Sequence, residues 1–305
     1  MGNVITAIDK SGSYTVYLAE TTDLVETARQ IHQTSPLGTA AIGRVLTGTG
    51  LMGLMLKEDR GKLTVQFKGD GPAREILATA DGAGHVKGYI SVPQVELPLR
   101  PDGHLDVGGS LGIGQLTVIK DIGLKEPYIG KIALASGEIA EDLTAYFFVS
   151  EQRNTSVALG VKVGRNQSVL AAGGMIIQML PGAEEGAVDA LEKRIRELPP
   201  ITTLLESAIL RSAGMTERGR LSLVLEDIFG AMPEAYQVTQ NGEGQLIWQC
   251  DCSKDRLAGA LMTIGKQDLQ QILEEDGKAE LTCQFCEKKY VFDQEELTEM
   301  LRQMK

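Results

Sequence analysis

The chain has 305 residues, 43% of them hydrophobic, and its 30 basic and 41 acidic side chains give a net charge of −11. This length and apolar content suffice for one large domain or a few small ones, and they exclude a disordered protein. The negative charge argues against a nucleic-acid partner, because binding to phosphates requires clustered lysine and arginine. The longest apolar stretch, Val169–Ile177, is too short to span a bilayer, so we expect no membrane partner.

Residues 1–178 are expected to form one α+β domain. Alternating apolar residues and β-branched side chains predict strands at Tyr14–Ala19, Lys62–Phe67, Gln115–Lys120, Ser156–Val163 and Ser168–Met179. Helical spacing predicts helices at Asp23–His32, Pro36–Leu56 and Glu138–Val149. We expect Thr22 to be the N-cap of the first helix, and Glu141 and Asp142 to lie on a solvated face of the third.

Residues 179–231 have a different texture and are expected to form a helical linker. Three short amphipathic helices are predicted, at Glu185–Leu198, Leu204–Ala213 and Leu221–Phe229. Pro199 and Pro200 end the first, and Gly214 and Gly219 separate the others. So many breaks favour a segment that rearranges more easily than a compact core.

Residues 232–305 are expected to form a small acidic module, with 8 basic and 14 acidic side chains. Helices are predicted at Leu269–Leu273 and Glu295–Leu301, and short strands at Glu280–Thr282 and Lys289–Phe292. All four cysteines of the chain lie in this part. The start of the chain lacks a basic region followed by an apolar one, so we expect a reducing, cytoplasmic location without structural disulfides at rest.

The four cysteines form two close pairs, Cys250-Asp-Cys252 and Cys283-Gln-Phe-Cys286. Two such pairs, brought together by a folded spacer, supply four thiolates for one tetrahedral Zn²⁺ per chain. About 70 residues make a marginal core, so we expect this module to depend on the metal for its fold. A redox dithiol without a metal is the main alternative.

Basic residues close to the cysteines in sequence are expected to offset the charge of four thiolates and to favour the thiolate form: Lys254, Arg256, Lys288 and Lys289. Thiolates bind zinc and disulfides do not, so oxidation would remove all four ligands. The module would then unfold, and the linker would loosen with it. The residues alone leave open whether the site is such a switch or an inert structural zinc site.

The sequence resembles the heat shock protein 33 family of redox-regulated bacterial chaperones over essentially its whole length. Besides the cysteine motifs, the similar segments are Ser35–Arg44, Val107–Gly112, Ser136–Leu143, Glu274–Gly277 and Tyr290–Asp293. The resemblance implies an inactive reduced form with zinc held by Cys250, Cys252, Cys283 and Cys286. It implies that oxidation forms Cys250–Cys252 and Cys283–Cys286 disulfides, releases zinc and unfolds the C-terminal module with its linker.

The same resemblance implies a function in oxidative and heat stress. The activated protein, a homodimer, would hold unfolding client proteins without ATP, and it would not be an enzyme and would have no catalytic residues. The sequence does not locate the client surface. The apolar linker residues Val188, Leu191, Ile195 and Leu198 are one candidate, and the small-residue segment Gly48–Leu56 is another.

Several other motifs favour different functions. Gly48–Gly53 matches a dinucleotide-binding pattern without the preceding strand, and close helix packing is the preferred interpretation. Ser110 lies in a G-x-S-x-G pattern, but the chain has only His32, His85 and His104, all before it, and a hydrolase of that type needs a later histidine. A thiol–disulfide oxidoreductase lacks its βαβ context, and a zinc-ribbon nucleic-acid module conflicts with the acidic charge.

Overall fold

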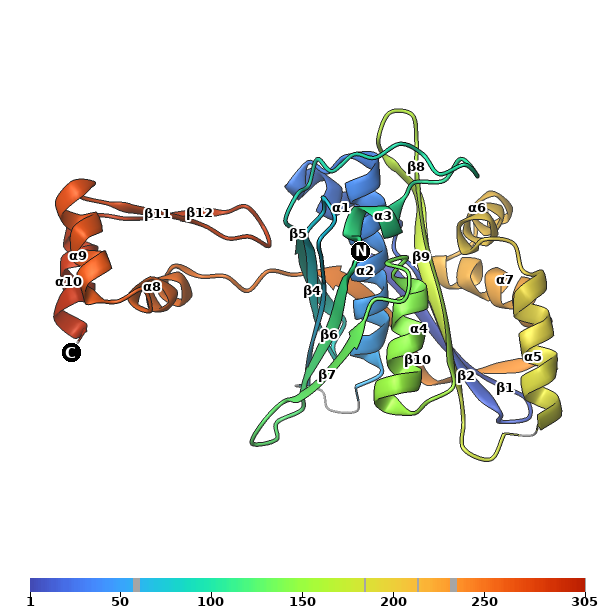
Figure 1. Cartoon of the computed structure of the whole chain (residues 1–305). Coiled ribbons are helices and arrows are strands. Elements are labelled where there is room, and N and C mark those ends of the chain that lie inside the picture. Colours follow the sequence, from blue (N-terminus) through green and yellow to red (C-terminus); the bar gives the residue numbers. More distant parts are fainter. Residues whose placement is uncertain (57–60, 184, 213, 231–234, 305) are drawn as a thin grey trace. The chain divides into compact units, whose positions relative to one another are not determined.

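The structure is a computed structural model of the whole chain, and it describes residues 1–56, 61–183, 185–212, 214–230 and 235–304. Two compact units, Met1–Gln249 and Cys250–Lys305, make up the chain (Figure 1). Within the described ranges, no helix is both long enough and apolar enough to cross a membrane.

A mixed sheet of ten strands forms the centre of the first unit, in the order β7-β6-β3-β4-β5-β10-β1-β2-β9-β8. The strands are β1 (Gly2–Asp9), β2 (Tyr14–Glu20), β3 (Lys62–Gly69), β4 (Glu75–Asp81), β5 (His85–Ile90), β6 (Gly114–Asp121), β7 (Tyr128–Ala133), β8 (Thr155–Val163), β9 (Val169–Met179) and β10 (Tyr236–Trp248). Neighbouring strands are antiparallel except β5 and β10, which are parallel and pair only through Ile247–His85 and Trp248–Val86. β10 therefore joins two antiparallel halves into one sheet, because it also pairs along its length with β1.

The helices of this unit are α1 (Thr22–His32), α2 (Pro36–Leu54), α3 (Val107–Leu111), α4 (Ala140–Glu151), α5 (Glu185–Glu197), α6 (Ile201–Arg211) and α7 (Glu217–Phe229). α2 is buried along most of its length in the main core. A Cβ atom on Gly48 would lie 2.7 Å from Leu143 Cδ1, and one on Gly50 would lie 2.6 Å from Leu246 Cδ1. The glycine motif in α2 therefore serves close helix packing, as predicted.

The helices α5, α6 and α7 cover the other face of the β1–β2–β9 part of the sheet (Figure 1). They bury Leu191, Leu205 and Leu225 against strand residues such as Ile5 and Leu18. This is a second apolar core, separate from the one around α2. The predicted linker helices are thus packed against the sheet, and of the apolar linker residues Leu191, Ile195 and Leu198 lie in or against that core.

One ion pair fastens α7 to the edge of this second core. Arg220 Nη1 lies 2.8 Å from Glu20 Oε2, and the Glu20 side chain is only 10% exposed. Such a shielded carboxylate needs its partner, since an unpaired buried charge is strongly destabilising. The docking of α7 therefore has a polar component besides its apolar face.

The second unit contains α8 (Lys254–Met262), α9 (Lys266–Glu275), β11 (Ala279–Thr282), β12 (Lys289–Phe292) and α10 (Gln294–Gln303). Its core is small and is built on Leu261, Leu269, Phe292, Leu297 and Met300. α10 begins with a capping box, in which Asp293 accepts from Glu296 N–H and the Glu296 side chain accepts from Asp293 N–H. That exchange fixes the end of the β11–β12 hairpin to α10.

The mixed α/β fold and most predicted elements are confirmed. The five strands predicted in residues 1–178 correspond to β2, β3, β6, β8 and β9, and the two in the acidic module to β11 and β12. The predicted helices correspond to α1, α2, α4, α5, α6, α7, α9 and α10, with ends that differ by a few residues. The predicted ranges do not include β1, β4, β5, β7, β10, α3 or α8.

Two local predictions were wrong. Thr21, not Thr22, is the N-cap of α1, and Thr22 Oγ1 instead accepts the N–H of Ala172. Asp142 does not lie on a solvated face, because it is fully buried. Its carboxylate accepts the N–H groups that precede α4 in the chain: Ala135 at 2.6 Å, Ser136 at 3.2 Å and Ile139 at 3.2 Å.

The predicted boundary between linker and C-terminal module, at 231/232, lies outside the described residues, as does the predicted helix end at Ala213. Residues 236–248, which the sequence analysis placed with the cysteines, form β10 of the first unit. The division into domain, linker and module at 178/179 and 231/232 stays a prediction.

Candidate metal centre

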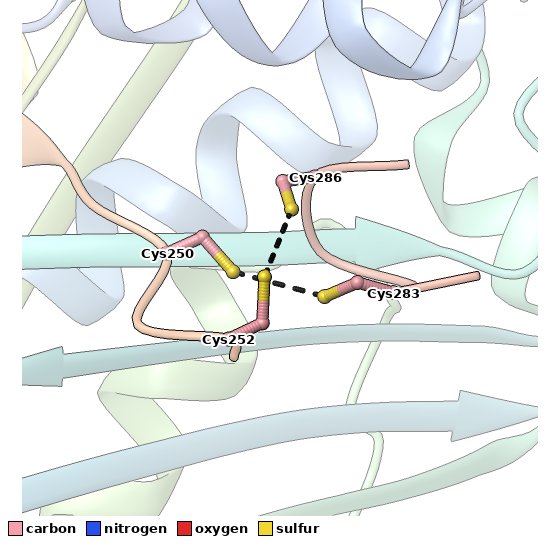
Figure 2. A group of neighbouring side chains, drawn as sticks. All are labelled: Cys250, Cys252, Cys283 and Cys286. Atoms are coloured by element: carbon pink, nitrogen blue, oxygen red, sulfur yellow. Dashed lines mark hydrogen bonds between the residues drawn. The ribbon is translucent and has the colours of Figure 1, made fainter. Parts of the chain in front are cut away.

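The side chains of the four cysteines of the second unit point toward one another (Figure 2). Cys250 and Cys252 lie on the extended segment before α8, and Cys283 and Cys286 lie on the turn between β11 and β12. All four sulfur atoms lie within 4.8 Å of one another. The contacts between the two pairs are 3.7 Å for Cys250–Cys283 and 3.4 Å for Cys252–Cys286.

This spacing suits a tetrahedral thiolate site. Zn–S bonds of about 2.3 Å place the sulfurs of such a site about 3.8 Å apart, close to the observed separations. All four cysteines are free, and a disulfide would need two sulfurs about 2.05 Å apart. The sulfurs are therefore spaced for one shared metal ion, and each also lies within a short movement of a disulfide partner.

Backbone groups support the sulfurs. The N–H of Cys252 donates to the sulfur of Cys250, and the N–H of Lys288 donates to the sulfur of Cys286. The turn that carries the second pair is closed by Cys283 N–H to Lys288 O at 3.0 Å and by Glu287 N–H to Cys283 O at 2.8 Å. Glu287 adopts a left-handed backbone conformation, with φ 58°. These groups orient the sulfurs and compensate negative charge at the site.

Tyr290, on β12, joins the two pairs. Its hydroxyl oxygen lies 3.2 Å from Cys252 Sγ and 3.2 Å from Cys252 O. Burial opposes ionisation of Cys252, but hydrogen bonds from Tyr290 and the neighbouring thiols outweigh it and lower the pKa of Cys252 to about 7. Burial raises the pKa values of Cys250 and Cys286. Cys252 is thus the most readily ionised of these three thiols, and the hydrogen bond to it raises the pKa of Tyr290 to about 12.

The four basic residues that are close to the cysteines in sequence contact other side chains of the second unit. Three of them pair with carboxylates: Lys254 with Glu296, Arg256 with Asp251, and Lys289 with Glu280. Lys288 lies over the Tyr290 ring, with Nζ 5.1 Å from its centre. Carboxylates therefore balance three of these charges, and the expectation that the four basic side chains favour the thiolates stays a prediction. The residue that sequence reasoning missed is Tyr290, whose role depends on the contact between two hairpin strands and a distant loop.

The alternative sites do not assemble. Ser110 is buried in α3 and donates to Val107 O at 2.7 Å, so it is not a presented nucleophile. His32, His85 and His104 all lie in the first unit, whereas the cysteines lie in the second. The Cys283–Cys286 turn connects two antiparallel strands, which is not the βαβ context of a thioredoxin-like dithiol.

A large mixed α/β unit followed by a small unit with four clustered thiols defines a class of protein whose C-terminal cysteines could hold a metal ion. Residues 2–293 match the family model described as Hsp33 protein. The chain belongs to the Hsp33 family, and the resemblance noted in the sequence is confirmed.

Individual relatives support this assignment over full length. The chain is 46% identical over 302 residues to the 33 kDa chaperonin of Clostridioides difficile, covering 99% of both chains. It is 43% identical over 302 residues to the 33 kDa chaperonin of Alkaliphilus metalliredigens, with the same coverage. Its structure is similar to the crystal structure of the 33 kDa chaperonin (heat shock protein 33 homolog) of Thermotoga maritima. The TM-score is 0.85 at 34% identity, covering 98% of this chain and 97% of that one.

Proposed function

We propose that this chain is a redox-regulated holdase chaperone that protects unfolding proteins from aggregation without ATP. In the reduced state Cys250, Cys252, Cys283 and Cys286 would hold one Zn²⁺, and the protein would be inactive. Oxidation of these cysteines would activate it. The observation that carries the proposal is the cluster of four thiols on a small unit, in a chain of the Hsp33 family.

The zinc ion, when bound, would supply a cross-link between the two cysteine pairs that no apolar contact replaces. With hydrogen peroxide as oxidant, the Cys252 thiolate attacks one peroxide oxygen, becomes a sulfenic acid and releases hydroxide. The Cys250 thiolate then attacks that sulfur and displaces a second hydroxide, which forms the disulfide. Two protons convert both hydroxides to water, so each disulfide consumes one peroxide. Cys283 and Cys286 react in the same way.

The pairing within each motif follows from the family resemblance. The sulfur contacts of 3.7 Å and 3.4 Å run between the motifs, so crosswise pairing, Cys250–Cys283 and Cys252–Cys286, is the chemical alternative. The two outcomes differ in topology, because crosswise disulfides would keep the first pair tied to the hairpin. Pairing within each motif frees the two pairs from each other and allows the unit to unfold.

The client surface is the apolar face between the β1–β2–β9 strands and α5–α7. If these helices detach, they uncover Ile5, Leu18 and Ile177 on the sheet and their own Leu191 and Leu205. Exposed contiguous apolar surface is what binds aggregation-prone chains. The other candidate, Gly48–Leu56, is the C-terminal end of α2 with the two residues that follow it, lies largely in the main core and would stay covered.

The test compares reduced and peroxide-treated protein at mild heat. We expect release of about one zinc per chain, the capacity of a single four-thiolate site, and suppressed aggregation of a thermally unfolding client without ATP. Peptide mapping after alkylation should find Cys250–Cys252 and Cys283–Cys286 disulfides. The matched control replaces all four cysteines by serine, and its client activity should not respond to peroxide. Retained zinc together with unchanged client aggregation would contradict the proposal.

A further inference from the structure

Tyr290 lies beside the four cysteines and is fixed by core packing, by strand pairing and by a contact of its hydroxyl. It is 8% exposed and packs in the core of the second unit with residues such as Phe292 and Leu297. Its backbone pairs with Leu281 of β11, so it is fixed to the hairpin that carries Cys283 and Cys286. Its hydroxyl, however, contacts Cys252 of the other pair. The ring therefore connects the two halves of the site without the metal.

The hydroxyl has one proton and two acceptors on the same residue, the sulfur and the carbonyl oxygen of Cys252, both at 3.2 Å. A thiolate carries a full negative charge and is the stronger acceptor, because hydrogen bonds to charged groups are about twice as strong as neutral ones. A disulfide sulfur is neutral and a weak acceptor, which leaves the carbonyl oxygen as the better partner. The direction of this hydroxyl thus follows the oxidation state of Cys252.

Resting on the proposed function, we propose that Tyr290 is a positioning residue that sets how readily Cys252 reacts with an oxidant. Donation of its proton to the Cys252 thiolate withdraws electron density from the sulfur and holds that sulfur in the site. The nucleophilicity of a thiolate falls as hydrogen bonding makes it less basic. Tyr290 therefore raises the oxidant level at which the switch operates.

The Lys288 ammonium strengthens the effect. It lies 5.1 Å from the centre of the Tyr290 ring, where a cation is attracted to the π electrons. A nearby positive charge also makes the phenol a better hydrogen-bond donor. Lys288 directly precedes β12, the strand that carries Tyr290.

The test uses Tyr290→Phe, which removes the hydroxyl and keeps the ring. The matched control is Tyr128→Phe in the first unit, which removes a hydroxyl that donates to Ser150 O at 3.0 Å. We expect both variants to bind about one metal per chain and Tyr290→Phe to release zinc to peroxide roughly three- to tenfold faster than the parent protein. In the Co²⁺-substituted protein, the thiolate-to-cobalt charge-transfer band of Tyr290→Phe should shift to lower energy. Tyr128→Phe should change neither quantity.

A second variant has the opposite expected sign. Replacing Tyr290 by 3-fluorotyrosine makes the phenol a stronger donor, so zinc release should be slower than in the parent protein. A residue that only fills space would not reverse the effect in this way. An unchanged rate in Tyr290→Phe with an unchanged cobalt band would overturn the inference and leave the proposed function standing. Failure of peroxide to release zinc from the parent protein would overturn the proposed function, and the cobalt band alone would then decide whether Tyr290 acts on the sulfur.

Discussion

Removal of the metal under reducing conditions should unfold the second unit and leave the sheet of the first unit folded. The perturbation is a high-affinity chelator with excess thiol reductant, so that no disulfide forms. This treatment removes the metal without oxidising the cysteines, whereas peroxide does both at once. The expected result rests on how small the core of Cys250–Lys305 is.

The magnitude follows from a comparison of two free energies. Structural zinc contributes about 10–16 kcal/mol of apparent binding free energy to small thiolate domains at neutral pH. At about 0.05–0.15 kcal/mol per residue, a unit the size of Cys250–Lys305 has a net free energy of unfolding of about 3–8 kcal/mol. Of its described residues, 250–304, seven are buried in its apolar core. Loss of the larger quantity leaves the folded state unfavourable by several kcal/mol, so fewer than about 1% of molecules should keep this unit folded.

The assay is hydrogen exchange followed by mass spectrometry at peptide resolution. Peptides from α8, α9 and α10 should lose protection after chelation, whereas peptides from β3, β4 and β6 should not change. Adding zinc back should restore protection, and the variant with four serines should exchange rapidly in that unit with or without chelator. Full protection of α9 and α10 in protein verified to be metal-free would refute the reasoning.

Two further predictions concern the first unit. Arg220→Ala leaves the shielded Glu20 carboxylate unpaired, so α7 should lose about 2–3 kcal/mol of docking free energy, less than a fully buried pair because Arg220 is 25% exposed. Faster hydrogen exchange across α7 checks it, with the 79% exposed Arg196→Ala as a control that should change little. Glu26→Gln should lower the melting temperature at neutral pH. The hydrogen bond from Arg29 lowers the pKa of Glu26 to about 2, so the charged carboxylate stabilises the folded state. Since the folded pKa lies below the unfolded value, this stabilisation is present above about pH 4.5 and is lost as the pH falls toward 2, so melting curves of the two proteins should converge there.

The cysteine site could be predicted from the sequence because its information is local. Each pair lies within four residues, and a structural site needs only that two such pairs meet. The contribution of Tyr290 could not be predicted in that way. It depends on β12 pairing with β11 and on the loop before α8 approaching that hairpin, and the contact of that loop with Tyr290 spans 38 residues.

Five of the ten strands in the sheet of the first unit were predicted from the sequence, and their order in the sheet was not. The alternation in β3 is strong because one face of the strand is buried and the other is partly exposed. β10 escaped prediction because its sequence is polar and includes two glycines, and because it becomes a strand only by pairing with β1, as in Gly2–Leu246. The position of Asp142 was mispredicted for a related reason, since its three N–H donors come from the segment before its own helix.

The proposed function requires that unfolding of the second unit spreads to the apolar face of the first unit. The first unit contains no cysteine and cannot itself be oxidised at a thiol. β10 is the segment that leads directly to Cys250. Its last residues are held to β5 by a parallel ladder of only two residue pairs, whereas its other residues pair with β1, a strand of the face that α7 covers. Short ladders at the end of a strand open at the lowest free energy. Unfolding that begins at Cys250 would therefore loosen β10 from its C-terminal end, which detaches Trp248 and Leu246 from the main core. It would then pass along the pairing with β1 to Tyr236, at the other end of β10, which lies in the core under α5–α7.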